Sequence, residues 1–286
     1  MVFTAPAKIN LYLKVIRRRN DGYHEIETLF ERISIFDHIS VKIDRERTTI
    51  SCDESRVPTG KDSLLGRACE AFKKKLGEDL HFQIVLKKNI PVAAGLGGGS
   101  SDTAALLTGI NRITGFPLGE EALLNIARDL GADIPFFMDD CRFAFGKGRG
   151  DIIRKINASM DIWHVLVTPS FGVSTKNIYS KLSAFNLTSD NGVDKMFSTF
   201  LSDNNINNLS ENLCNDLQAI VLRDFPVLEK VFFELKKAGA KGALLSGSGP
   251  AVFGIFGREE VMDASEKIKS VFSETENWRV EVVRTY

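Results

Sequence analysis

A glycine-rich segment between a predicted strand and a predicted helix constrains this chain more than any other feature. The sequence PVAAGLGGGSSD, residues 91–102, places four of its glycines within residues 95–99. The residue pattern predicts a strand over 81–87 and a helix over 100–115, and this helix opens with two serines and an aspartate, which are typical of an N-cap and a first turn. A strand, a glycine loop and a helix therefore follow one another directly.

This loop has the properties of a phosphate-binding site. A helix start presents unpaired N–H groups and the positive end of the helix dipole, and glycines allow a phosphate to approach the backbone. The nucleotide-binding residues that we predict are Pro91, Val92, Ala93, Ala94, Gly95, Leu96, Gly97, Gly98, Gly99, Ser100 and Ser101. The segment matches neither the P-loop, because no Lys precedes its serines, nor the dinucleotide fingerprint, so a cation distant in sequence must offset the phosphate charge. The alternative is a flexible hinge or tight turn.

Composition excludes several classes of protein. Thirty-seven basic and thirty-seven acidic residues cancel, so no broad attraction to nucleic acid or to an anionic membrane is expected. The first residues carry too many cations for a signal peptide, and no run approaches the roughly 18 apolar residues of a membrane span. The four Cys and four His residues fall at no metal-ligand spacing, so we predict no metal site in the chain. A cytoplasmic protein is expected.

The length of 286 residues is compatible with two lobes or with one large domain, and the pattern changes near residue 156. We predict an N-terminal domain over 1–156 and a C-terminal domain over 157–286. The second contains strands over 161–169, 242–246, 251–257 and 278–286, and helices over 223–239 and 259–272. The order strand, helix, strand, strand, helix, strand is that of a ferredoxin-like α+β domain. The polar segment 184–215 is the least patterned part and is expected to be a surface loop.

Three motifs together resemble the GHMP kinases, the family of galacto-, homoserine, mevalonate and phosphomevalonate kinases. They are PAKINLYLKVIRRRNDGYHEIETLF, PVAAGLGGGSSDTAA and LLSGSGPAVFGIF. The resemblance spans nearly the whole chain and is weakest over 184–215. It implies an α+β fold with two lobes, a ribosomal-S5-like N-terminal lobe that binds ATP and a ferredoxin-like C-terminal lobe.

Within this family, the first motif is most similar to that of the members that act on 4-diphosphocytidyl-2-C-methyl-D-erythritol. The resemblance therefore implies a kinase of non-mevalonate isoprenoid biosynthesis, with ATP and Mg²⁺ as cofactors. The γ-phosphoryl group would be transferred to the 2-hydroxyl of that small-molecule substrate, and no nucleic acid or membrane partner is implied. A monomer and a homodimer both remain open.

Phosphoryl transfer to an alcohol needs a group that takes the hydroxyl proton and a group that offsets charge on the γ-phosphoryl. By resemblance, these catalytic residues are Asp133, in GADIPFF, and Lys8, in PAKINLYL, lying together at the acceptor hydroxyl. Asp133 would be the base, and Lys8 would orient the hydroxyl and stabilise negative charge. Simpler interpretations remain: Asp133 could cap a helix, and Lys8 could extend to solvent from a core strand.

A cytidine group needs flat apolar faces and hydrogen bonds at its edge, which Tyr23 and His24 can supply. By resemblance, Tyr23 stacks on cytosine, His24 bonds its edge and Tyr179 closes the stack. Thr175 would contact the ligand, and Asn10 would meet the substrate near the catalytic lysine. The alternative for the DGYH segment is an ordinary hairpin turn.

Two further motifs allow more than one interpretation. Gly247 and Gly249 in SGSGP fit a tight turn between strands, or by resemblance the floor of the active site. Lys147 and Arg149 in FGKGRGD are phosphate neighbours or solvated charges at a strand end.

Alternative functions also remain at this point. A kinase of homoserine or mevalonate would have no use for the base-stacking residues. A non-catalytic relative that binds nucleotide would not need both a base and a cation. A structural protein with a glycine hinge would show no stabilisation by ATP.

Overall fold

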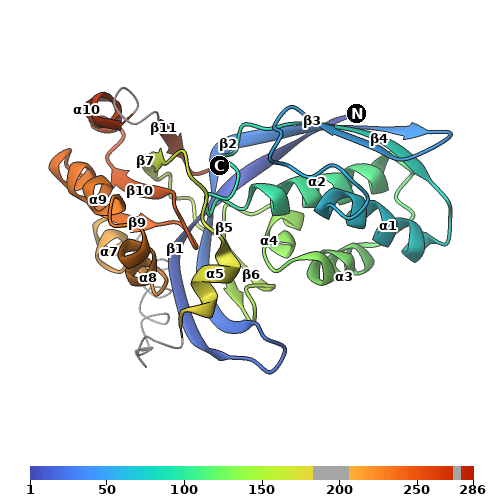
Figure 1. Cartoon of the computed structure of the whole chain (residues 1–286), viewed down its shortest axis with the longest axis horizontal. Coiled ribbons are helices and arrows are strands. Elements are labelled where there is room, and N and C mark those ends of the chain that lie inside the picture. Colours follow the sequence, from blue (N-terminus) through green and yellow to red (C-terminus); the bar gives the residue numbers. More distant parts are fainter. Residues whose placement is uncertain (183–205, 273–277) are drawn as a thin grey trace. The chain divides into compact units, whose positions relative to one another are not determined.

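The computed structural model describes residues 1–182, 206–272 and 278–286, and the chain forms two compact units. Unit 1 contains residues 1–7, 35–92 and 97–140, and unit 2 contains residues 8–34, 93–96 and 141–286. Figure 1 shows β1 (Val2–Arg18) and β2 (His24–Asp44) as two long strands, and each of them has residues in both units. This division interleaves along the sequence. The domain boundary near residue 156 stays a prediction.

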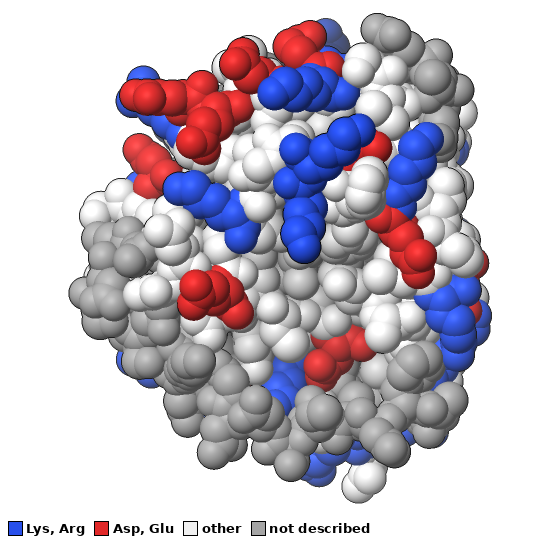
Figure 2. Space-filling view, turned by 90° about the vertical axis from the view of Figure 1, so that its left-hand side faces the viewer, with Lys and Arg blue, Asp and Glu red and all other residues white. Residues whose placement is uncertain are grey.

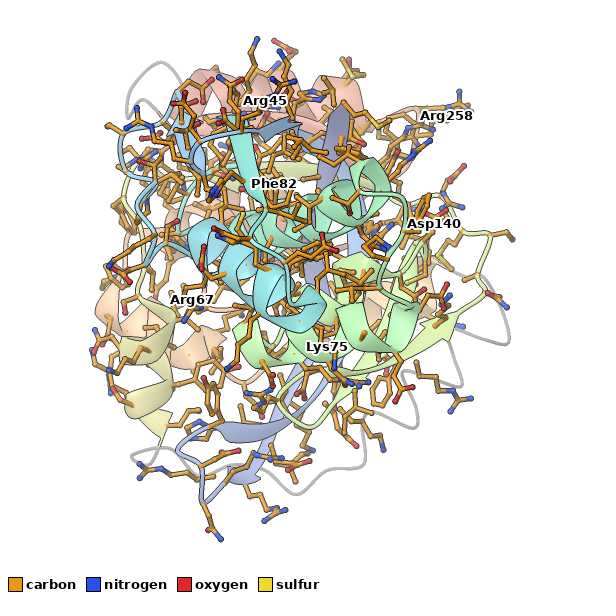
Figure 3. The ribbon with its side chains drawn as sticks, turned by 90° about the vertical axis from the view of Figure 1, so that its right-hand side faces the viewer. Arg45, Arg67, Lys75, Phe82, Asp140 and Arg258 are labelled. Carbon is orange, nitrogen blue, oxygen red and sulfur yellow. The ribbon has the colours of Figure 1, made fainter. Side chains whose placement is uncertain are left out.

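Unit 1 combines strands with four helices. Strand β4 (His81–Lys87) pairs antiparallel with the second half of β2, placing His38 opposite Lys87, and β3 (Thr49–Cys52) pairs parallel with β4. The helices are α1 (Leu64–Leu76), α2 (Gly98–Ile113), α3 (Glu120–Leu130) and α4 (Ile134–Met138). Phe82 of β4, labelled in Figure 3, packs edge-on against Phe72 of α1 with ring centroids 6.5 Å apart. Both rings are fully buried, so they join the strands to the helices.

Helix α1 shows how the local sequence sets an element's bounds. Ser63 accepts a hydrogen bond from the backbone N–H of Gly66 at 3.1 Å, and Gly77 ends the helix in the left-handed conformation. A serine cap and a terminal glycine are the usual signals for these two positions. The residue pattern of the sequence also predicts a helix from Ser63 to about Leu76, and the structure confirms it.

Unit 2 contains the predicted ferredoxin-like arrangement. Its four-stranded sheet has the order β11-β7-β10-β9, with every pair antiparallel. These strands are β7 (Trp163–Thr168), β9 (Gly242–Leu245), β10 (Val252–Phe256) and β11 (Arg279–Arg284), and the helices of this pattern are α9 (Leu228–Lys237) and α10 (Val261–Phe272). The first and last strands thus lie side by side in the sheet, as the strand-helix-strand, strand-helix-strand pattern requires. The α+β class is confirmed.

The remaining elements of unit 2 lie beside the long strands or between the elements of the sheet. They are β5 (Phe143–Lys147), β6 (Ile152–Ile156), α5 (Thr175–Ser180), α7 (Ile206–Glu211), β8 (Cys214–Asn215) and α8 (Gln218–Asp224). Strand β5 pairs antiparallel with β2 and with β6, and β8 pairs parallel with β1. These elements include α5, which carries two of the predicted substrate-binding residues.

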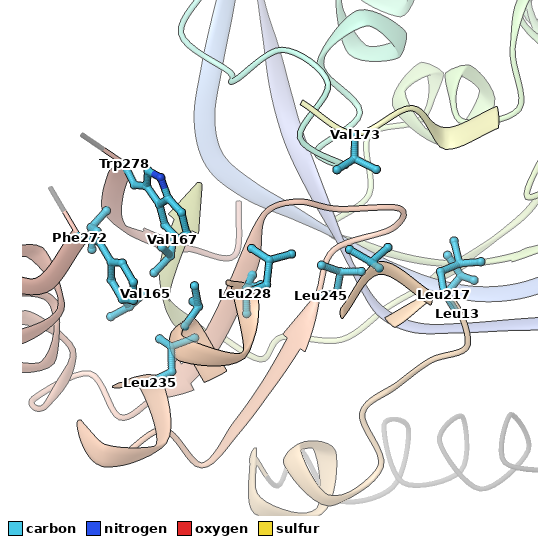
Figure 4. Close-up of a cluster of buried hydrophobic side chains, with 14 of the residues drawn as sticks. Leu13, Val165, Val167, Val173, Leu217, Leu228, Leu235, Leu245, Phe272 and Trp278 are labelled. Atoms are coloured by element: carbon cyan, nitrogen blue, oxygen red, sulfur yellow. The ribbon is translucent and has the colours of Figure 1, made fainter. Parts of the chain in front are cut away.

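A continuous apolar core holds unit 2 together. Figure 4 shows Val165 and Val167 of β7 among the buried side chains, with Leu235 of α9 below them. The rings of Phe272 and Trp278 stack with centroids 5.2 Å apart and nearly parallel planes. Because such burial is the main favourable contribution to folding, this core sets the stability of the unit.

Two predictions about the second half of the chain need correction. The single helix predicted over 223–239 is wrong, because α8 ends at Asp224 and α9 begins at Leu228. Pro226 lies between them and disfavours a helical Phe225, which takes φ −132° and ψ 69°. Of the predicted loop 184–215, residues 206–211 form helix α7, and residues 184–205 lie outside the described residues.

Helix α9 offers a matched test of this core. We expect Leu235→Ala to lower the free energy of unfolding by roughly 2–5 kcal/mol, because Leu235 is fully buried. Phe233→Ala on the same helix removes a ring that is 63% exposed and should change it by less than about 0.5 kcal/mol. Urea unfolding of both variants measures the difference, and equal effects would contradict this description of the core.

Candidate active site

The second half of the glycine loop starts helix α2 in unit 1. The helix begins at Gly98, and its N-cap is Gly97 with φ +70° and no side-chain cap. The expectation that the serines and aspartate provide the N-cap is therefore wrong, since a glycine in the left-handed conformation starts the helix earlier. The N–H of Ser101 bonds the Gly97 carbonyl at 2.9 Å. Its buried hydroxyl has no hydrogen-bond partner among the residues that the structure describes.

A buried ion network stands behind this helix start. Lys88 donates to Asp37 of β2 and, at 2.9 Å, to Asp102 of α2. The exposed fractions of the three side chains are 6%, 0% and 3%. The pKa of Asp102 is raised to about 7, mainly because the group is buried and also by the charge of Asp37, while the ammonium of Lys88 opposes the increase. The network therefore holds two carboxyl groups and one ammonium away from water.

The same network positions the chain that leads into the loop. Asp37 accepts hydrogen bonds from the N–H groups of Asn89 and Ile90 at 2.5 and 2.8 Å. A Cβ atom on Gly98 would lie 3.1 Å from the Lys88 ammonium, so the first residue of α2 packs directly on this cation. Lys88 is thus the lysine beside the predicted phosphate site, and it is bound to carboxylates. In the sequence, this lysine is recognisable only as a charged residue just before the glycine loop.

The first half of the loop, Ala93–Leu96, belongs to unit 2 and is held by its backbone. The carbonyls of Ala93, Ala94 and Leu96 accept hydrogen bonds from the N–H groups of Val173, Ala251 and Lys8, at 3.1, 3.2 and 3.0 Å. The Gly95 carbonyl accepts from the hydroxyl of Ser246 at 3.0 Å. Four consecutive carbonyls are therefore paired with three separate chain segments.

The SGSGP turn, residues 246–250, meets these segments in unit 2. A Cβ on Gly247 would lie 3.2 Å from Asn10 Oδ1 and 3.4 Å from Lys8 Nζ. Ser248 and Thr175 share a hydrogen bond of 2.7 Å between their hydroxyls. The turn thus brings the predicted residues Lys8, Asn10 and Thr175 to one small region.

The side chain that fixes this turn is not among the predicted site residues. Asn215 donates hydrogen bonds to the carbonyls of Leu245 and Gly247, both at 2.8 Å. Nothing in the local sequence distinguishes this asparagine from its neighbours in the polar segment.

Lys8 and Asn10 point inward from β1 as a bonded pair. Lys8 Nζ donates to Asn10 Oδ1 at 2.7 Å, and Asn10 Nδ2 donates to the Thr28 hydroxyl at 2.7 Å. Both side chains are almost fully buried, and the Lys8 ammonium lies 5.6 Å from the ring centroid of Phe30. Lys8 therefore does not extend to solvent, which removes the simpler interpretation of this residue.

Asp133 lies in unit 1, at the residue preceding α4. Its side chain makes no capping hydrogen bond to that helix, so the geometry does not support a simple cap. The pairing of Asp133 with Lys8 joins residues of different units and stays a prediction.

The predicted cytidine residues fall in unit 2. Tyr23 is 54% exposed, and its N–H bonds Asp21 Oδ1 at 3.0 Å. The rings of His24 and Tyr179 lie 5.2 Å apart at an angle of 38°. Burial, followed by the charge of Arg18, lowers the pKa of His24, so near neutral pH its ring has one donor and one acceptor nitrogen. These groups can bind a flat ring with polar edges.

The described residues contain no group of three or more His, Cys, Asp or Glu side chains that could hold a metal ion. Acidic and basic side chains are interspersed on the face drawn in Figure 2. No helix in the described part of the chain is long and apolar enough to cross a membrane.

Comparison with known proteins identifies the family. The model of the GHMP kinases N terminal domain matches residues 63–146, and that of the GHMP kinases C terminal matches residues 198–274. A 4-diphosphocytidyl-2-C-methyl-D-erythritol kinase of Geobacter metallireducens is 36% identical, covering 99% of this chain and 98% of the relative. The chain belongs to the GHMP kinase family. The prediction of an ATP-dependent small-molecule kinase is thereby confirmed.

A further relative and two solved structures are also similar to this GHMP kinase. A kinase of the same name from Syntrophotalea carbinolica is 38% identical, with 89% of each chain covered. A crystal structure of 4-(cytidine 5'-diphospho)-2C-methyl-D-erythritol kinase matches with a TM-score of 0.81 at 30% identity, covering 99% of this chain and 98% of that one. A homoserine kinase from Cytophaga hutchinsonii has a TM-score of 0.75 at 19% identity, covering 100% and 93%, and shares the fold.

Substitution of Gly95 tests the packing of the loop. Gly95 has φ +79°, and a Cβ there would overlap the carbonyl oxygen of Ser246. Gly77 has φ +77° and open space around it. We expect Gly77→Ala to cost about 1–2 kcal/mol of stability from backbone strain, and Gly95→Ala to cost about 1–3 kcal/mol more from overlap. Chemical denaturation measures both, and similar losses would argue against the close approach.

The raised pKa of Asp102 predicts a pH dependence of stability. Between its ordinary value of 3.8 and about 7, the folded protein keeps a proton on Asp102 that the unfolded chain releases. Protonation of Asp102 therefore stabilises the folded protein at low pH, and this stabilisation is lost as pH rises through about 7. Asp102→Asn should remove this stabilisation. The free energy of unfolding, measured in urea at about pH 5 and about pH 8, should therefore decline less in the variant than in the unsubstituted protein. An identical decline in both proteins would contradict the assignment.

Proposed function

We propose that this GHMP kinase transfers the γ-phosphoryl group of ATP to the 2-hydroxyl of 4-diphosphocytidyl-2-C-methyl-D-erythritol. Relatives that cover the chain almost completely bear the name of this kinase. The observation that carries the proposal is the arrangement in unit 2, where the exposed Tyr23 ring and the His24–Tyr179 pair provide flat surfaces for a base. The other acceptors considered, homoserine and mevalonate, contain no ring to stack.

The glycine loop supplies the site for the ATP phosphates. The start of α2 at Gly98 leaves backbone N–H groups of its first turn available, and the helix dipole favours an anion there. Residues 91–101 would surround the nucleotide, with Ser100 and Ser101 offering hydroxyl groups.

Mg²⁺ would enter with ATP. Magnesium commonly keeps several waters and binds substrate phosphates with only one or two protein ligands, so a site without a carboxylate cluster is compatible with it. The buried, unpartnered hydroxyl of Ser101 is a suitable oxygen ligand. When bound, the ion would offset charge on the transferring phosphoryl group.

Lys8 and Asp133 would act on the acceptor hydroxyl. Asp133 accepts the proton of the acceptor hydroxyl. Lys8 orients this hydroxyl and stabilises negative charge on the γ-phosphoryl group as it is transferred. The hydrogen bond from Lys8 to Asn10 holds the ammonium in place, and Asn10 with Thr175 would contact the substrate. Tyr23 would stack on cytosine, with His24 at its edge and Tyr179 closing the stack.

The test is ADP release with ATP, Mg²⁺ and each of three acceptors. Turnover with 4-diphosphocytidyl-2-C-methyl-D-erythritol and none with homoserine or mevalonate is expected. Turnover with either control acceptor instead would refute the cytidine site. A cytoplasmic location and a monomeric or homodimeric state stay predictions.

Asp133→Asn tests the proposed base. We expect kcat to fall by at least about 100-fold, since general base catalysis contributes about 10²–10⁴-fold, while the affinity for ATP stays within about twofold. Asp140→Asn, in the same GADIPFFMDD segment, is the matched control and should leave kcat unchanged. If Asp133→Asn turned over at the normal rate, Asp133 would have no part in proton transfer.

A further inference from the structure

Arg149 lies against the ring of Tyr23. The carbon of its guanidinium is 5.0 Å from the ring centroid, in unit 2. Sequence analysis left this residue open between a phosphate neighbour and a solvated charge. The structure gives it a third position, over the face of an aromatic ring that is itself 54% exposed.

Asp151 fixes the orientation of this guanidinium. Its Oδ2 accepts from Arg149 Nε at 3.1 Å and from Nη2 at 2.8 Å, and its Oδ1 accepts from the Arg149 backbone N–H at 3.0 Å. Two of these hydrogen bonds hold the planar guanidinium in one direction, and the third restrains the Arg149 backbone. The guanidinium is therefore a prepared flat surface.

The backbone near Tyr23 is fixed as well. Arg19 N–H bonds the Tyr23 carbonyl at 2.8 Å, and Ile26 N–H bonds the Gly148 carbonyl at 2.7 Å. The second bond ties β2, two residues after the DGYH segment, to the turn that carries Arg149. Both the ring and the cation therefore have restrained backbones, and their contact is built into this turn.

Lys147, two residues earlier, differs from Arg149. Its ammonium pairs with Glu27 at 3.1 Å, lies 5.4 Å from the Phe145 ring and is on a side chain that is 57% exposed. It is a half-exposed charge at a strand end that is paired with a carboxylate. The contrast makes Lys147 a matched control, because it is also a cation over an aromatic ring in the same hairpin.

We propose that Arg149 is a positioning residue for substrate recognition: it holds one face of Tyr23 and leaves the opposite face for the pyrimidine of the acceptor. This inference rests on the proposed function. The cation–π contact restrains the ring before the base arrives, so less side-chain freedom is lost on binding. Arg149 acts through Tyr23 and needs no contact with the substrate.

Calorimetric titration with cytidine and with CDP tests this role, with ADP present at saturation to fill the nucleotide site. Arg149→Met should weaken both ligands equally, by about three- to fivefold, since the contact is worth about as much as an exposed cation–π pair. Lys147→Met should leave both affinities unchanged. A loss for CDP but not for cytidine would mean a direct phosphate contact and would overturn the proposal.

A double-mutant cycle separates positioning from an independent contribution. Because Arg149 acts through the ring, adding Arg149→Met to Tyr23→Ala should weaken cytidine no further. Additive losses would overturn the proposal. If Tyr23→Ala alone left cytidine affinity unchanged, the base-stacking part of the proposed function would fail instead.

Kinetics and a second variant distinguish this role from a general structural one. Arg149→Met should raise KM for the cytidyl acceptor while leaving KM for ATP unchanged. Asp151→Asn weakens the restraint on the guanidinium without removing it. This variant should show a smaller increase in KM for the cytidyl acceptor. Equal increases in both KM values, in either variant, would indicate a structural defect and overturn the proposal.

Discussion

The buried ion network of Lys88, Asp37 and Asp102 is the constraint on which the proposed phosphate-binding end of the glycine loop depends. Taking two carboxyl groups and an ammonium out of water costs more free energy than a surface ion pair returns, so such a network adds little to stability by itself. Its geometry has a different consequence. It joins β2, the entry to the glycine loop and helix α2 through side chains that have no freedom to rearrange. The first turn of α2 is therefore in position before any phosphate arrives.

In unit 2 the equivalent constraint is made almost entirely of backbone. The carbonyls of Ala93–Leu96 bond three chain segments and the Ser246 hydroxyl, and the SGSGP turn adjoins Lys8, Asn10 and Thr175. Backbone contacts of this kind tolerate many side chains but no extra volume, as the approach of Gly95 to Ser246 shows. The two ends of one loop are thus fixed by different physical means, charge at one end and close packing at the other.

Much of the fold could be predicted because its signals are local. The Ser63 cap, the alternation in β2 and the apolar pattern of the ferredoxin-like sheet depend on neighbours within a few residues. Pro226 was also visible in the sequence, and it breaks the helix that was predicted across it. The network of Lys88 with Asp37 could not be predicted, since the two are 51 residues apart and each looks like an ordinary surface charge. The role of Asn215 could not be predicted for the same reason, because the carbonyls that it binds lie far from it in the sequence.

The fold itself cannot carry the choice of substrate, because a homoserine kinase shares it. Specificity must lie in side chains that the common framework presents, and the proposed function assigns it to the DGYH segment. A half-exposed tyrosine would lose much of its affinity for a base to its own rotamer freedom. In the role that we propose, Arg149 on one face of the ring removes that freedom without touching the substrate. Recognition in such an enzyme therefore depends on the residues behind the binding surface as well as those on it.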